Sequence, residues 1–351
     1  MSDSSDGTSS MNSMHQRAGA SQLKIKILLE VNRWVIVGGL AASIFVTLVL
    51  VGTFGPAPIP VLLQYQDPID TLFQGLVSGV ITGVTLILTI NQLVLSQELD
   101  PIGTQRERMK GALSFRQDLE DATALAVSPA QPSTFLRALI EAIRRKAITL
   151  EDAMDTGIDG DMRDEIEDTV DGITDNAEEA QEQLTDSQFG TFNVLGAALG
   201  FNYSRKVHDL RRLRNLHSDS LPDEVNERLN DLLEVIKFFG PAREHIKTLY
   251  FRWELIDLSR AILYAAIPSL TTTFLMILFY NPREIPGEIL GVPNTLWLVS
   301  LAVAITILPF LILLSYILRI ATVAKRTLAI GPFVLRTTDR NEEIEWEDDF
   351  E

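Results

Sequence analysis

The stretch GLVSGVITGVTLILTINQ, residues 75–92, decides the fold because it is apolar enough for a membrane yet carries regularly spaced small and polar residues. Three glycines stand four residues apart in it, and a hydroxyl or amide occurs on almost every helical turn. It lies within the charge-free run 71–97, which exceeds the roughly 20 residues that an α-helix needs to cross the hydrocarbon layer. The sequence therefore predicts a membrane span with an unusual polar side.

Three further runs have the same length and lack of charge: 34–54, 261–280 and 295–318. Together the four runs predict an all-α integral membrane protein with four transmembrane helices. They contain no Asp, Glu, Lys, Arg or His, which argues against a proton-coupled pump with an ionisable group at the midplane. Pro268 and Pro309 are expected to kink or loosen the third and fourth spans.

Basic residues at the ends of the runs predict the orientation. They are Lys24, Lys26, Arg33, Arg106, Arg108, Lys110, Arg116, Arg252, Arg260, Arg319, Lys325 and Arg326. Because basic residues favour the cytoplasmic side, both termini and the long insert between spans two and three should lie there. The proline-rich segments 55–70 and 281–294 should be short external turns. No cleavage pattern follows the first span, which should stay as an anchor in the cytoplasmic membrane.

Composition then divides the chain into five parts. Residues 1–20 are serine-rich and expected to be disordered. Residues 21–97 should form an interfacial helix and the first transmembrane hairpin, and residues 259–325 the second hairpin. Between them, residues 98–258 read as a cytoplasmic helical domain, and residues 326–351 as an acidic cytoplasmic tail.

The insert is predicted to be helical throughout. Helices are expected over 100–126 and 133–154, and the segment 151–187 carries 15 acids against the single base Arg163. Such a helix needs salt, a cation or a basic neighbour, and the basic segment 203–217 suggests an antiparallel hairpin of the two. Pro222 and Pro241 should each open another helix, the second continuing into span three. Long helices of this kind form a coiled-coil-like stalk or bundle.

Charge and residue usage narrow the function classes. The net charge of −17 makes nucleic-acid binding improbable, since no dense basic face is present. The absence of cysteine excludes disulfides, thiolate nucleophiles and cysteine zinc sites. In composition the chain resembles halophilic archaeal proteins, whose acidic surfaces suit a salty cytoplasm.

No catalytic or metal-binding motif is present. His208 and His217 are nine residues apart, on opposite sides of a helix, and cannot share a metal. The segment Asp155 to Ile166 resembles a calcium loop, but Gly157 and Ile166 occupy positions that require oxygen ligands. Two interpretations of the segment 151–187 remain: a weak cation site and a solvated acidic turn. No cofactor, metal or enzymatic activity is therefore predicted.

The polar residues of the second span fall on one face of a helical wheel. At about 100° per residue they all lie within about 40° of Ser78. These candidate pore-lining residues are Thr71, Gln74, Ser78, Thr82, Thr85, Thr89, Gln92 and Ser96. Helix-packing glycines, Gly75, Gly79 and Gly83, lie on one flank, where a neighbouring backbone can approach closely. Leu76, Val80, Val84, Ile87 and Val94 form the apolar back.

Two interpretations of this polar face remain open. Hydroxyls can bond within their own helix or lie in a dry interface between packed helices. Alternatively, the face meets water, which the amides of Gln74 and Gln92 favour. Asp67 and Asp100 continue the same face toward its two ends and would mildly favour cations.

The topology of four spans, with a helical insert after the second, is similar to that of bestrophin-type channels. This resemblance is architectural, and it implies an oligomer whose second helix lines a pore. We therefore expect an oligomeric channel or conduit in the lipid bilayer. The alternative is a membrane-anchored scaffold or sensor whose helical insert binds a cytoplasmic protein partner.

Overall fold

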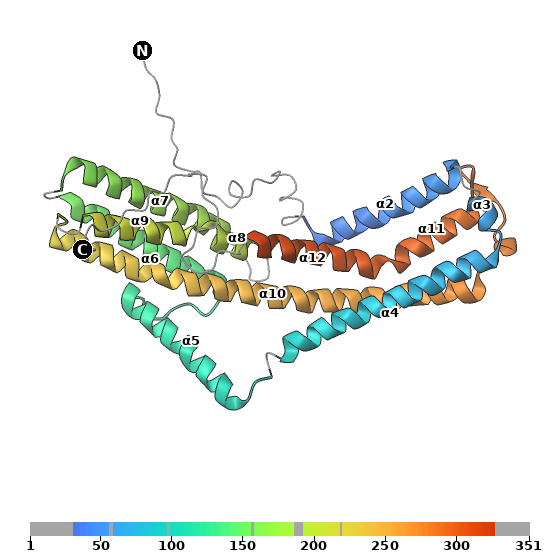
Figure 1. Ribbon diagram of the computed structural model, residues 1–351, viewed down its shortest axis with the longest axis horizontal. Coiled ribbons are helices and arrows are strands. Elements are labelled where there is room, and N and C mark those ends of the chain that lie inside the picture. The colour runs from blue at the N-terminus through green and yellow to red at the C-terminus, as the bar shows by residue number, and fades with distance from the viewer. Residues whose placement is uncertain are drawn as a thin grey trace, which may run out of the picture. The chain divides into compact units, whose positions relative to one another are not determined.

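The structure is a computed structural model that describes residues 31–55, 59–96, 99–155, 158–185, 192–217 and 220–326. This part of the chain is almost entirely helical, as predicted (Figure 1). The tails 1–20 and 327–351, and the predicted interfacial helix up to residue 30, lie outside the described residues. The chain divides into two compact units, and each is described separately.

The first, which we call the span unit, combines residues from both ends of the described chain. It contains Ser21–Met109 and Thr248–Val323. Its helices are α2 (Arg33–Phe54), α3 (Ile59–Leu62), α4 (Gln66–Ser96), the second part of α10 (Asp223–Phe279), α11 (Asn294–Thr306) and α12 (Leu308–Arg326). The turn between α10 and α11 holds the short helix η3 (Pro282–Glu284) and the antiparallel strands β1 (Glu288–Ile289) and β2 (Val292–Pro293).

Three helices of the described chain, α2, α4 and α10, are long and apolar enough to cross a membrane. The bent pair α11 and α12 would be a fourth candidate if the two helices form one span. These helices cover most of the four charge-free runs of the sequence. In the span unit α2 packs beside α11, where the rings of Phe45 and Trp297 lie 5.7 Å apart between centroids (Figure 1).

The fourth predicted span is broken rather than continuous. Helix α11 ends at Thr306, and α12 leaves it at an angle of 44°. Pro309 has no N–H to donate to Ile305, and the Phe310 N–H donates to the Ile307 carbonyl at 3.0 Å instead. The Thr306 carbonyl freed in this way accepts a hydrogen bond from the Ser269 hydroxyl at 2.7 Å. The break is therefore stabilised by a polar side chain of α10.

Ser269 belongs to a small cluster of buried hydroxyls. The Thr273 hydroxyl donates to the Ser269 carbonyl at 2.7 Å and lies 3.1 Å from the Thr306 hydroxyl. All three side chains are buried. Since buried polar groups are costly when unpaired, this cluster fixes the position of the break.

Replacing Ser269 with alanine should destabilise the protein by about 1 to 2 kcal/mol, because it leaves the Thr306 carbonyl buried without a donor. The measurement is the thermal unfolding midpoint of the full chain in detergent. Thr271→Ala is the matched control, because Thr271 is exposed on the same helix and donates to its own Ile267 carbonyl. Equal midpoints for the two variants would show that the hydroxyl does not support the break.

A second difference concerns α10, which runs unbroken through Pro241 and Pro268. The sequence predicted that Pro241 opens a new helix, and this prediction was wrong. The segment is held by packing on its neighbours: the ring of Phe239 lies 4.6 Å from Phe201 and 5.8 Å from Tyr203. Gly240 completes this contact, since a Cβ atom there would lie 3.1 Å from the Tyr203 ring. Tertiary packing thus outweighs the lost hydrogen bond of one proline.

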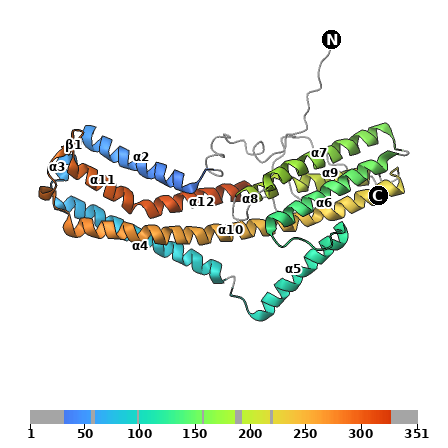
Figure 2. The same cartoon turned by 180° about the vertical axis from the view of Figure 1, so that it is seen from behind.

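The second unit, which we call the bundle unit, is formed mainly by Lys110–Lys247. It contains the end of α5 (Ile102–Thr123), α6 (Pro132–Asp152), η2 (Ala153–Asp155), α7 (Gly160–Leu184), α8 (Phe192–Gly200), α9 (Tyr203–Leu216) and the first part of α10. One apolar core joins these helices, and Figure 2 shows them gathered along α10. The acidic helix α7 takes part through buried residues spaced three or four apart, namely Met162, Ile166, Val170, Ile173, Ala177, Ala180 and Leu184.

Helices α7 and α9 lie antiparallel, although α8 comes between them in the sequence. The Asn176 side chain accepts from the Asn202 N–H at 3.2 Å, and Lys206 Nζ donates to the Gly172 carbonyl at 2.6 Å. Farther along, His217 Nε2 lies 3.2 Å from a carboxylate oxygen of Glu165. The arginines of α9 also have other partners: Arg205 pairs with Asp209 of its own helix and Arg214 with Asn230 of α10.

Candidate functional site: the polar face of α4

Helix α4 has one buried side, which packs against the rest of the span unit. Its buried residues are Ile69, Phe73, Val80 and Ile87. Phe73 belongs to a cluster with residues of α2, α10 and α11, and Ile87 to a second cluster with residues of α2, α10 and α12. The apolar back predicted from the wheel is therefore the side that packs within the chain at these positions.

The polar face points the opposite way. All eight candidate residues, Thr71, Gln74, Ser78, Thr82, Thr85, Thr89, Gln92 and Ser96, are exposed in the single chain. On the helical wheel, Ser78 at the centre of the face lies about 180° from the buried Ile87. Exposed apolar residues such as Ile81 and Leu88 border the face. The chain thus presents this polar face to whatever surrounds it.

The hydroxyls on this face are satisfied within α4 itself. Thr82, Thr85 and Thr89 each donate to the carbonyl four residues earlier, at 2.8 to 2.9 Å. Thr71 does the same at 2.9 Å, and Ser96 donates to the Leu93 carbonyl at 2.8 Å. These bonds let a threonine face an apolar surface at little cost. They therefore do not decide between the two interpretations of the face.

The two glutamines differ from the threonines. Within the described residues, the exposed amides of Gln74 and Gln92 make no hydrogen bond. An amide moved from water into hydrocarbon without a partner costs several kcal/mol, roughly 2 to 7. Helix α4 consequently favours water or a polar partner next to both glutamines.

The three glycines of the flank have different surroundings. A Cβ atom at Gly79 or Gly83 would lie 3.4 or 3.3 Å from the ring of Phe310, so both glycines pack against α12 of the same chain. A Cβ atom at Gly75 would meet nothing within 4 Å. The close neighbour at Gly79 and Gly83 is thus an aromatic ring, whereas the glycine pattern suggested the backbone of another helix.

At one end of the polar face a charge is already paired. Asp100, which the sequence placed at a mouth of the predicted pathway, forms an ion pair with Arg108 at 2.6 Å. Asp67, at the other end, is exposed. Because one of the two carboxylates is paired with an arginine, the argument that the pathway prefers cations is weaker.

A cluster of ionisable residues, most of them buried, joins the start of α2 to the middle of α10 and to α12, and it was missed by sequence reasoning. We call Arg33, Tyr250, Glu254, Tyr316 and Arg319 the Glu254 cluster. Arg33 of α2 donates to Glu254 of α10 at 2.5 Å, and its guanidinium lies 4.3 Å from the centre of the Tyr316 ring. Arg319 of α12 donates to the Val31 carbonyl at 2.8 Å. Glu254 is 0% exposed and Arg319 7%.

Burial dominates the electrostatics of this cluster. Desolvation raises the pKa of Glu254, although Arg33 and Arg319 oppose the shift. Desolvation likewise raises the pKa of Tyr250, which lies beside the Glu254 carboxylate. From the sequence alone, Arg33 and Arg319 indicated only the orientation of the membrane spans. Two acids, Glu254 and Asp257, lie one or two turns before a span and between basic residues, and this was the signal that could have found the cluster.

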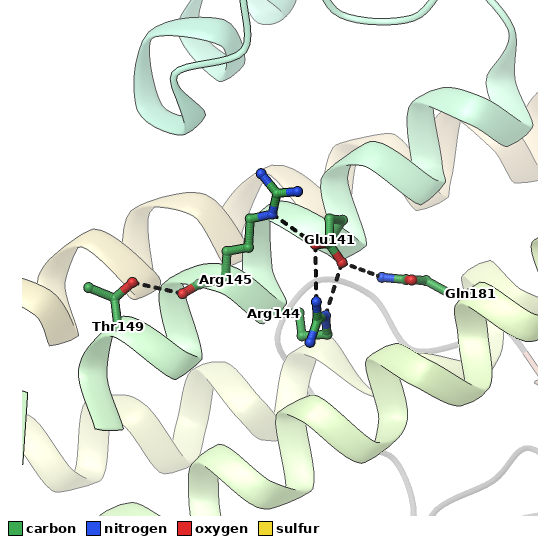
Figure 3. A network of polar contacts seen from close by, with 5 residues as sticks. All are labelled: Glu141, Arg144, Arg145, Thr149 and Gln181. Atoms are coloured by element: carbon green, nitrogen blue, oxygen red, sulfur yellow. Dashed lines mark hydrogen bonds and ion pairs between the residues drawn. The ribbon is translucent and has the colours of Figure 1, made fainter. Parts of the chain in front are cut away.

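The bundle unit holds a polar network centred on Glu141 of α6 (Figure 3). Its carboxylate accepts from Arg144 at 2.9 Å, from Arg145 at 2.8 Å and from Gln181 of α7 at 2.9 Å. These hydrogen bonds, that from Arg144 first, lower the pKa of Glu141 to about 2. The network therefore stabilises the contact between α6 and α7 while Glu141 is ionised.

The stability that Glu141 provides should depend on pH. Because its folded-state pKa is about 2 and the ordinary value is 4.5, the stabilisation is complete above pH 4.5 and falls away as pH drops toward 2. Since the side chain is partly exposed, we expect about 1 kcal/mol. The thermal midpoint of Glu141→Gln in the full chain should lie below that of the parent at neutral pH and approach it in acid. Glu179→Gln, an exposed change on α7, is the control, and a gap that persists at pH 2 contradicts the assignment.

The histidines form no metal site in the part of the chain that is described. His208 lies 3.3 Å from Asp209, and His217 contacts Glu165. Among the described residues no group of three or more His, Asp or Glu side chains could hold a metal ion. Asp159, from the segment compared with a calcium loop, caps α7 by accepting from the Gly160 N–H at 2.9 Å. Gly157 lies outside the described residues.

The long apolar helices and the helical bundle place the chain in the class of largely helical membrane proteins. Within it, the chain belongs to DUF7972, a family of unknown function whose model matches residues 1–348. No curated protein matches the chain, and no solved structure does. The family match carries no link to bestrophin-type channels or to haloarchaeal proteins, so these resemblances stay predictions.

Proposed function

We propose that the protein is an oligomeric membrane channel or conduit in which the polar face of α4 lines the pathway. The observation that carries this proposal is the direction of the face. It lies opposite the side of α4 that packs within the chain, and all eight of its residues are exposed. One chain cannot enclose a pathway with a face on its own surface, so several copies must surround it.

The surroundings of α4 support an oligomer over a lone chain in lipid. A lone chain would turn Gln74 and Gln92 toward hydrocarbon without a hydrogen-bonding partner. Copies arranged around an axis would turn these amides to water, while exposed apolar residues such as Leu86 and Leu88 would face neighbouring copies or lipid. In this arrangement α11 and α12 form one bent span, which gives four spans with both termini and the bundle unit in the cytoplasm.

A membrane-anchored scaffold or sensor is the second candidate. The specific observation that favours it is the bonding of Thr82, Thr85 and Thr89 to their own helix, which lets α4 pack without water. In this case the bundle unit, with the acidic surface of α7, would bind a cytoplasmic protein partner. The two candidates differ in whether ions or solutes cross the membrane.

Conductance of the purified protein in a planar bilayer tests the proposal, together with its mass in detergent. A channel predicts discrete current steps and a mass of at least three copies. A strictly monomeric mass would exclude a pathway built from one helix per subunit. An oligomer without conductance under any condition would favour the scaffold.

A further inference from the structure

The first part of α5 contributes no side chain to a hydrophobic core in the described part of the chain. Every residue from Pro101 to Ser114 is exposed. A solitary helix of this length is marginal in water, because most helical stability in proteins comes from packing an apolar face. An external surface is therefore needed to explain why this segment is helical.

The segment carries a defined apolar line. At about 100° per residue, Ile102, Met109 and Leu113 fall within about 20° of one line along the helix. Their exposed fractions are 86%, 65% and 53%. Leu99, just before the helix, adds a further exposed apolar side chain. These residues form the free apolar face of α5.

This free face is distinct from the face that holds the end of α5 in the bundle unit. Phe115, Leu119 and Ala122 pack in the core of that unit. On the wheel they lie about 100° to 160° away from the line through Ile102. The helix therefore has two apolar faces on different sides, and packing within the chain accounts for only one of them.

Basic residues border the free apolar face. Arg106 and Lys110 lie about 40° and 80° from its centre, whereas the acid Glu107 lies about 140° away. Both bases are exposed, and among the described residues neither forms an ion pair. In a chain with a net charge of −17, two free bases next to an apolar line complement an anionic surface.

The position in the chain identifies that surface. Helix α4, long and apolar enough to cross a membrane, ends at Ser96, and α5 begins at Ile102. The five residues between them can span at most about 20 Å. The start of α5 must therefore lie close to the membrane surface from which α4 emerges.

We propose that residues 99–114 form an interfacial helix that lies on an anionic lipid surface, with Ile102, Met109 and Leu113 in the headgroup boundary. Amphipathic helices bind membranes in this way, and Lys or Arg near an anionic surface strengthens the binding. The lipid partner is a bilayer with anionic headgroups. The inference holds whether or not α4 lines a pathway.

The test uses the absence of cysteine from the chain. Single cysteines at Met109 and Leu113, and at Thr104 on the other side of α5, are labelled with nitrobenzoxadiazole in the full-length protein. The protein is reconstituted at low ionic strength in phosphatidylcholine vesicles with and without phosphatidylglycerol. Lipids with a spin label near the headgroup should quench the labels at 109 and 113 several-fold more than the label at 104, most strongly with phosphatidylglycerol.

Three outcomes would overturn the proposal. Equal quenching at 104 and 109 would mean that the helix does not present this face to lipid. Protection of the label at 109 from aqueous iodide without quenching by lipid would identify a protein surface, such as a second copy. The double variant Arg106→Gln and Lys110→Gln, made in the Met109→Cys chain, should reduce quenching with phosphatidylglycerol to the level without it. Unchanged quenching would refute the anionic preference.

Discussion

Replacing Glu254 with alanine is expected to destabilise the protein by about 3 to 5 kcal/mol, because it leaves the positive charges of Arg33 and Arg319 without their buried partner. The carboxylate is fully buried and joins the start of α2 to α10. The measurement is the thermal midpoint and the yield of folded full-length protein in detergent. We expect a large loss of both.

A matched control and a double variant make this prediction specific. Glu234→Ala removes an exposed carboxylate from the same helix and should change stability by less than about 0.5 kcal/mol. Replacing both Arg33 and Glu254 with methionine should cost less than the sum of the two single changes, since both members of the pair are removed. Additive single effects, or a loss no larger than in Glu234→Ala, would mean that the Glu254 cluster does not hold the helices together.

Replacing Thr82, Thr85 and Thr89 together with valine should reduce conductance to a small fraction of that of the parent protein. Valine has nearly the shape of threonine, and the hydroxyls bond only to their own helix, so α4 should keep its fold. In the proposed pathway the change would create an apolar constriction about two turns long, which excludes water. The measurement is single-channel and macroscopic current in planar bilayers.

The control for this triple change is Ile81→Val with Leu88→Val, on the exposed apolar borders of the same helix. Both proteins should keep the oligomeric mass of the parent, and only the triple variant should lose current. A triple variant that conducts like the parent would show that the polar face is not the conducting surface. If the mass changes as well, the face is instead part of the subunit contact.

The spans and the helical insert could be predicted from the sequence because long charge-free runs and helical periodicity depend on local composition. The break at Thr306 could not, because the run 295–318 is uniformly apolar and the stabilising donor, Ser269, comes from another helix. The same holds for Pro241, where contacts of Gly240 and Phe239 with distant aromatic rings keep α10 continuous.

The candidate site, too, could be predicted only in part from the sequence. The wheel identified the polar face of α4 because its residues belong to one helix. Which side of α4 packs within the chain depends on α2, α10, α11 and α12, and only the structure shows it. The Glu254 cluster joins residues more than two hundred positions apart, so no spacing in the sequence could reveal it.

Accessibility to a membrane-impermeant thiol reagent tests the central claim most directly. Single cysteines are placed at Ser78, Thr85 and Thr89 of the polar face and at Ile81 and Leu88 beside it, all exposed in the single chain. In reconstituted bilayers the account predicts rapid modification at the three polar positions, with loss of current, and little at the two apolar ones. Uniformly unreactive polar positions, or equal reactivity at all five, would contradict a water-filled pathway along α4.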